Sequence, residues 1–219
     1  YIEDKQFMSC RQVIPYKDKL FYLPEHSGII WEYCRSTKNW KEHKKCIEDF
    51  RKDLAAEKYE GLQVMLDYAQ AGSCIYIVAG YTNRILCFNM EDAAYRILEV
   101  GNAEYGYSAI TGYDSTFWLA EIQSGKIVKW NVQTGEVMEV EMPDGFERFQ
   151  RHNMSYYVHN RLFDMGSWIV SVPAFSNSIV KVNKVTGEVS LCGSPLWEET
   201  DAPANDYHPR FHLVCCFAK

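Results

Sequence analysis

Short apolar runs alternate with turn signals along most of this chain, and the alternation repeats. The clearest copy is residues 117–137, which read FWLAEIQSGKIVKWNVQTGEV. An apolar run from Phe117 to Ala120 leads to a Ser124-Gly125 turn, and a second run from Ile127 to Trp130 leads to a turn that ends at Thr134-Gly135-Glu136. Gly and Asn supply positive φ in tight hairpins. The pattern therefore predicts two strands, each followed by a tight turn.

Three further copies of this pattern are present. In each copy an apolar anchor in one strand is followed, at a nearly constant distance, by the isoleucine that opens the next strand. The pairs are Phe21 and Ile30, Tyr76 and Ile85, Trp118 and Ile127, all nine residues apart, and Ile169 and Ile179, ten apart. A spacing that recurs four times indicates an internal structural repeat.

Each copy also predicts a strand before the hairpin and a strand after it. The first strands are expected at Cys10–Ile14, Met65–Ala69, Tyr107–Thr111 and Val158–Leu162. Last strands are expected at Val137–Val140 and Val189–Leu191. Four antiparallel strands in a unit of roughly 40–50 residues are typical of a β-propeller blade.

The residues from Ile127 to Val137 resemble the blade signature of YVTN-type and quinoprotein-like propellers, and Ile179 to Val189 repeat it. The resemblance implies an all-β fold, a β-propeller of four-stranded antiparallel blades, as a single domain or a fragment of one. The blade units would span about residues 7–38, 62–100, 105–142 and 155–192, with a partial fifth blade at 207–219. Propellers of this kind include enzymes, scaffolds and binding modules, so the resemblance leaves the function open.

The end of the chain repeats the approach to the fourth blade. His152 lies six residues before Val158, and His208 lies six before Val214. Four blades and one strand do not obviously close a ring. We expect part of a propeller of roughly six to eight blades, or residues missing from the sequence, with a self-contained four-blade ring as the alternative.

One segment, residues 39–59, breaks the repeat. Ile47, Phe50 and Leu54 fall at helical spacing within it, with charged residues elsewhere. This predicts an amphipathic helical insertion that covers a blade edge. A helix that docks a partner is the alternative.

Composition narrows the class of function. The chain has 219 residues, of which 47% are hydrophobic and 24% charged, so a globular domain is expected. The net charge of −6 argues against nucleic acid, and apolar runs are too short to predict a membrane span. The eight cysteines form no Cys-x-x-Cys pair. They are interpreted as structural thiols, which favours a cytoplasmic location, or an extracytoplasmic one if the chain is a processed fragment.

Polar residues on the predicted innermost strands are the first candidate site. Innermost strands surround the central channel of a propeller, and convergent polar groups in a concavity are what a small-molecule site needs. The channel candidates are Arg11, Asp67, His159, Asn160 and Arg161. The alternative is a solvated channel without activity.

The second candidate site is the loop that joins the third and fourth blades, residues 144–157. Loops that lead into innermost strands lie on one face of the disc, and this loop is rich in cationic, amide and aromatic side chains. The loop-face candidates are Arg148, Arg151, His152, Asn153, Tyr156 and Tyr157. A packed loop whose arginines satisfy carbonyl groups at blade ends is the alternative.

The sequence carries no catalytic motif, and we expect neither a metal nor a cofactor. The favoured function is therefore a non-catalytic binding or scaffolding module for a protein or a small molecule, acting through the loop face. A hydrolase or lyase with a site at the channel mouth, and a carbohydrate-binding propeller, remain alternatives. The oligomeric state is left open.

Overall fold

The structure, a computed structural model, describes residues 10–52, 64–102, 106–148 and 157–192. These residues form four antiparallel sheets of four strands each. Blade 1 contains β1 (Cys10–Tyr16), β2 (Lys19–Pro24), β3 (Ile30–Cys34) and β4 (Trp40–His43), followed by helix α1 (Lys45–Arg51). Blade 2 contains β5 (Asp67–Ala71), β6 (Cys74–Val78), β7 (Arg84–Asn89) and β8 (Tyr95–Glu99). Blade 3 contains β9 (Tyr107–Tyr113), β10 (Thr116–Glu121), β11 (Ile127–Asn131) and β12 (Val137–Val140). Blade 4 contains β13 (His159–Met165), β14 (Trp168–Pro173), β15 (Ile179–Asn183) and β16 (Val189–Cys192).

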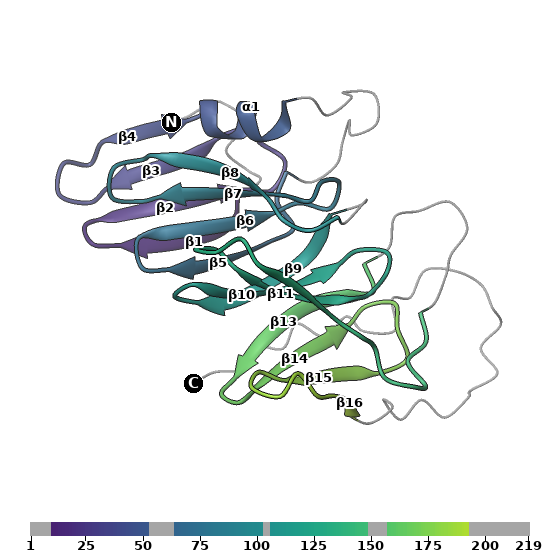
Figure 1. Cartoon of the computed structure of the whole chain (residues 1–219). Coiled ribbons are helices and arrows are strands. Elements are labelled where there is room, and N and C mark those ends of the chain that lie inside the picture. The colour runs from purple at the N-terminus through teal and green to yellow at the C-terminus, as the bar shows by residue number, and fades with distance from the viewer. Residues whose placement is uncertain (1–9, 53–63, 103–105, 149–156, 193–219) are drawn as a thin grey trace, which may run out of the picture.

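The strands of each blade pair in chain order, and the blades follow one another along an arc (Figure 1). The first strands of blades 2, 3 and 4, which are β5, β9 and β13, lie next to one another. This is the arrangement of a β-propeller, with each first strand innermost. The predicted all-β fold and its four blades are therefore confirmed. The predicted partial fifth blade at 207–219 lies outside the described residues.

The hydrophobic core lies between successive blades. Phe21 and Phe88 meet edge to face between blades 1 and 2, with ring centroids 5.9 Å apart. Tyr76 and Phe117 pack between blades 2 and 3 at 4.4 Å. Trp118 packs in the cluster shared by blades 3 and 4. Each blade is thus stabilised by its neighbours, as repeat architectures require.

A backbone hydrogen bond recurs at each junction between blades. The acceptor is the carbonyl of the residue that follows the second strand of one blade, and the donor is an amide just before, or at the start of, the next innermost strand. The bonds are Val64 N to Glu25 O at 2.7 Å, Tyr107 N to Ala79 O at 3.2 Å, and Val158 N to Ile122 O at 3.1 Å. The repeat seen in the sequence is therefore also a repeat of main-chain contacts.

The predicted helical insertion at residues 39–59 is wrong at its start. Trp40–His43 is the fourth strand of blade 1, and the helix begins only at Lys45. Trp40 lies opposite Tyr33 in the sheet, with the two rings 4.7 Å apart, and such cross-strand aromatic pairs stabilise a strand edge. The helix itself covers the core, because Ile47 and Phe50 are buried within it. Leu54 lies outside the described residues.

The sequence alignment of blade 4 was also displaced by one residue. Trp118 lies opposite Lys129, two residues after the isoleucine that opens β11. In blade 4 the position that matches Lys129 is Lys181, two residues after Ile179. The residue opposite Lys181 is Val170, not Ile169. Val170 is nine residues before Ile179, so the apparent spacing of ten is an error of alignment. Consequently the residue of β13 that matches Asp67 of β5 is Arg161.

Candidate functional site

Two of the channel candidates occupy bulges at matching places in their strands. The pairing of β1 with β2 shifts between Cys10 and Gln12, and that of β13 with β14 shifts between His159 and Arg161. Arg11 and Asn160 are the residues at these shifts. A β-bulge redirects side chains and is frequent next to functional sites. Both side chains line the same cavity.

That cavity lies at the innermost strands and has a volume of about 440 Å³. It is lined by Arg11, Asp67, Tyr68, Ile110, Thr111, Asn160, Arg161, Leu162, Phe163 and Val172. Its walls combine charged, amide, hydroxyl and aromatic groups from all four blades. Four of the five channel candidates are thus brought together, and His159 is not among them.

Asp67 is the centre of this cluster and connects three blades. Its Oδ1 accepts a hydrogen bond from Nη1 of Arg161, which reaches it from blade 4. Its Oδ2 accepts the backbone N–H of Ile110 from blade 3, at 3.1 Å. The Asp67 side chain is 2% exposed, whereas that of Arg161 is 41% exposed. A buried carboxylate therefore holds an accessible guanidinium at the cavity wall.

The electrostatics of the cluster follow from this burial. Loss of solvent raises the pKa of Asp67 to about 6, against the opposing effects of Arg161, the Ile110 N–H and Arg11. Arg11 also forms an ion pair with Glu25 at 3.6 Å, close to the outer limit for such a contact. Burial likewise raises the pKa of Tyr68, which keeps its phenol protonated at neutral pH. The cavity wall is thus neutral or cationic apart from the enclosed Asp67.

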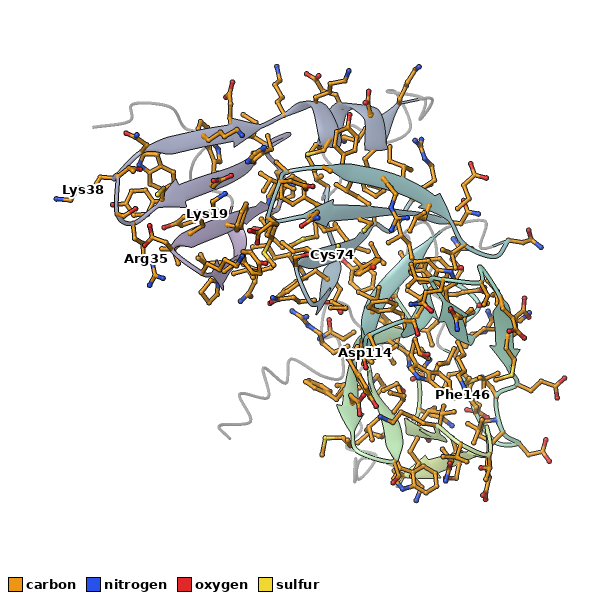
Figure 2. The ribbon with its side chains drawn as sticks, turned by 60° about the vertical axis from the view of Figure 1, so that its left-hand side comes forward. Lys19, Arg35, Lys38, Cys74, Asp114 and Phe146 are labelled. Atoms are coloured by element: carbon orange, nitrogen blue, oxygen red, sulfur yellow. The ribbon has the colours of Figure 1, made fainter. Side chains whose placement is uncertain are left out.

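His159 belongs to the junction between blades 3 and 4. It is fully buried, its Nε2 donates to the carbonyl of Gly125 at 2.8 Å, and its ring stacks on Phe146 at 5.7 Å. Figure 2 labels Phe146 at this end of the molecule. Burial lowers the pKa of His159 to about 4, which keeps the imidazole neutral. Its contacts are those of a packing residue.

The loop-face candidates are only partly described. Arg151, His152, Asn153 and Tyr156 lie outside the described residues. Arg148 pairs through its backbone with Ser176, and its Nη1 donates to the carbonyl of Gln123 at 2.6 Å. This contact matches the alternative in which arginine satisfies a carbonyl at a blade end. Tyr157 is half-buried.

Several lining residues were not found by the sequence reasoning. Tyr68, Thr111, Phe163 and Val172 contribute aromatic, hydroxyl and apolar surface to the cavity. The repeat does contain a signal for one of them, because Thr111 lies opposite the anchor Trp118. The others depend on how neighbouring blades are placed, which one sequence does not reveal.

The described residues also bear on the cysteines, on metal binding and on membrane spans. Six cysteines there are free thiols: Cys10, Cys34, Cys46, Cys74, Cys87 and Cys192. Within the same ranges, no group of three or more His, Cys, Asp or Glu side chains is placed to hold a metal ion. The helix in this part of the chain is too short to cross a bilayer.

Comparisons with known proteins support the fold. No protein-family model and no curated protein sequence matches the chain. Among solved structures, it resembles virginiamycin B lyase from Staphylococcus aureus, with a TM-score of 0.56, 13% identity, and coverage of 81% of this chain and 53% of that one. A streptogramin B lyase matches at a TM-score of 0.56 and 16% identity, over 84% of this chain and 54% of the other. The chain spans about half the length of these lyases.

Two further structures show how broadly the fold is shared. The extracellular domain of a putative one-component system from B. thetaiotaomicron matches with a TM-score of 0.61 and 8% identity, over 89% of this chain and 23% of that one. The computationally designed Ika4 protein matches with a TM-score of 0.50 and 10% identity, over 89% of this chain and 96% of its own. Identities this low show a common β-propeller fold and carry no function across.

Proposed function

We propose that this chain is a binding module that takes a small ligand into the cavity formed by its innermost strands. The observation that carries the proposal is the convergence of Arg11, Asp67, Asn160 and Arg161 on one cavity of about 440 Å³. Small-molecule sites are concave, measure roughly 300–1,000 Å³, and combine apolar walls with a few placed polar groups. The Asp67–Arg161 pair fixes one such group in place before a ligand arrives. A preorganised group loses less freedom on binding, which strengthens affinity.

Ligand binding accounts for this cavity better than catalysis does. Asp67 is the only carboxylate among the described lining residues, and its side chain is 2% exposed. Both its oxygens already accept hydrogen bonds, from Arg161 and from the Ile110 N–H. A general acid or base must reach the proton that it transfers on the substrate. The carboxylate of Asp67 is instead buried behind the guanidinium of Arg161, so it is poorly placed for this role. The likeness to lyases is one of fold and does not change this conclusion.

Ligand-observed NMR with a library of small polar and aromatic fragments tests the proposal. Val172→Trp would fill the cavity, because Val172 lines it directly opposite Arg161 in the sheet. Val185→Trp is the matched control, since Val185 is 89% exposed in a turn of the same blade. We expect fragments to bind the wild type and Val185→Trp and to lose binding in Val172→Trp. Fragments that bind all three proteins equally, or no binding to any of them, would overturn the proposal.

A further inference from the structure

We propose that the ligand of this cavity is a small organic carboxylate whose anionic group is attached to a flat apolar or aromatic body. This inference rests on the proposed function and names its ligand class. Three observations carry it: the balance of charge around the cavity, the way Arg161 is held, and the nature of the remaining wall.

The charge balance favours an anion. Two guanidinium groups, those of Arg11 and Arg161, line the cavity together with one carboxylate, that of Asp67. Asp67 is enclosed, while the side chains of Arg11 and Arg161 are 27% and 41% exposed. A ligand in the cavity therefore meets the accessible surfaces of two cations, of which Arg161 is held by the enclosed Asp67 and Arg11 is paired with Glu25 at 3.6 Å. A cationic ligand would face both of them and would reach no exposed carboxylate among the lining residues.

The hydrogen bonding of Arg161 favours a carboxylate in particular. A guanidinium has five N–H donors in a planar fork, which matches the two oxygens of a carboxylate. Asp67 accepts one hydrogen bond from Nη1 of Arg161. Because Oδ2 of Asp67 also accepts the backbone N–H of Ile110 in blade 3, the anchored side of the guanidinium is fixed in position. Donors on its accessible side are left to engage a ligand in the bidentate manner.

The rest of the wall fits a flat apolar body. Ile110 is buried, Tyr68 and Val172 are half-buried, and all three line the cavity with Phe163. Aromatic and aliphatic side chains of this kind contact a planar ring favourably through offset or edge-to-face packing. The hydroxyl of Thr111 and the amide of Asn160 add neutral hydrogen-bonding groups. Inorganic anions would leave the apolar part of this surface without a partner.

Isothermal titration with four probes tests the inference: benzoate, benzamide, acetate and inorganic phosphate. Benzamide has the shape of benzoate without its charge, acetate has the charge without the ring, and phosphate is an anion of different geometry. We expect benzoate to bind the full chain at least about tenfold more tightly than each of the other three, which corresponds to about 1.4 kcal/mol.

Variants identify the cation that is responsible. Arg161→Met should weaken benzoate binding by about tenfold or more, and Arg161→Lys should recover only part of it, because an ammonium cannot form the fork. The double variant Arg161→Met with Asp67→Asn removes the cation without leaving a buried, unpaired carboxylate, so it serves if the single variant does not fold. Arg35→Met is the matched control, because Arg35 lies at a turn of blade 1 and points away from the other blades (Figure 2). Circular dichroism checks that each variant is folded.

The outcomes separate this inference from the proposed function. Equal binding of benzoate and benzamide, lost from both in Val172→Trp, would overturn the charge preference while the cavity remained a binding site. Phosphate or acetate binding as tightly as benzoate would overturn the assignment of a flat body. If no probe binds but fragments from the library do, the ligand class is wrong. If nothing binds at all, both proposals fail.

Discussion

Arg161 of β13 donates a hydrogen bond to Asp67 of β5, although 94 residues and the whole of blade 3 separate them in the chain. The two residues occupy the same position in their respective blades, opposite Val172 and Val78 of the second strands. At this position blade 1 has Gln12 and blade 3 has Ala109. Blades 2 and 4 therefore carry opposite charges at equivalent sites, while the equivalent residue of blade 3 is a small, buried alanine.

This arrangement predicts how the ionisation of Asp67 responds to Arg161. The positive charge of Arg161 lowers the pKa of Asp67 and so partly offsets the increase caused by burial. In Arg161→Met we therefore expect the pKa of Asp67 to rise above its wild-type value of about 6. Carboxyl ¹³C NMR titration of the labelled proteins measures it. Arg35→Met should leave the value unchanged, and a pKa that falls in Arg161→Met would contradict the geometry.

The buried His159 predicts a loss of stability in acid. Its pKa is about 4 when folded and near 6.5 when unfolded, so between these values the unfolded chain binds a proton that the folded one does not. The contribution of His159 is present above about pH 6.5 and is lost as the pH falls through the folded value. It amounts to about 3 kcal/mol in full. The test is urea unfolding of His159→Gln, whose amide can still donate to the carbonyl of Gly125, at pH 7 and 4.5. The difference in the free energy of unfolding between the two pH values should be smaller in this variant than in the wild type. An unchanged pH dependence would contradict a buried neutral imidazole.

Asp67 should act in the opposite direction. Its folded pKa, about 6, is above the unfolded value of 3.8, so its contribution is present at low pH and is lost as the pH rises through about 6. Asp67→Asn should therefore be more sensitive to acid than the wild type, because the effect of His159 is then unopposed. The same urea experiments measure this, and a variant less sensitive to acid than the wild type would be the contrary result.

Gly125 predicts a steric requirement at the junction of blades 3 and 4. Its φ is +70°, and a Cβ there would lie 2.7 Å from Cγ1 of Val158. Gly135 has a similar φ of +76° but nothing within 4 Å of such a Cβ. Both Gly→Ala variants should lose about 1 kcal/mol through backbone strain, and Gly125→Ala should lose about 2 kcal/mol more through the contact with Val158. Thermal or urea unfolding compares the stability of the two variants. Equal losses in the free energy of unfolding would show that Val158 can move away from the added Cβ without destabilising the junction.

Helix α1 predicts a packing contribution from a segment that interrupts the repeat. Phe50 is fully buried in the cluster shared by blades 1 and 2. Phe50→Ala should lower the free energy of unfolding by about 3–4 kcal/mol through the lost contacts and the cavity left behind. Glu48→Ala on the exposed side of the same helix is the control, and its ion pair with Lys44 at 3.4 Å predicts a change below about 0.5 kcal/mol. Similar losses in both variants would argue that the helix is not part of the core.

The fold was largely predictable because it depends on local patterns that the chain repeats. The last strand of blade 3 was predicted at Val137–Val140, and that is where β12 lies. Trp40–His43 escaped prediction, because a strand of four residues with charged Lys41 and Glu42 has no clear alternation. The register of blade 4 was displaced because Ile169 and Val170 are both apolar, and the sequence alone did not distinguish which one is the anchor.

The sequence predicted which strands carry the candidate site, but it predicted few of the contacts between the side chains in that site. The repeat directed attention to Arg11, Asp67, Asn160 and Arg161, and all four line the cavity. The pairing of Asp67 with Arg161 joins blades that are not adjacent in sequence, so no spacing encodes it. His159 was misleading because a bulge between it and Arg161 turns its side chain into the junction between blades.

The most direct measurement is a crystal structure of the protein with benzoate bound. We expect benzoate in the cavity of the innermost strands, with both carboxylate oxygens about 2.7–2.9 Å from nitrogens of Arg161 and the ring against Tyr68 or Val172. Arg161 should keep its hydrogen bond to Asp67. An empty cavity with benzoate at the outer rim of the blades, or benzoate whose carboxylate points away from Arg161, would contradict it.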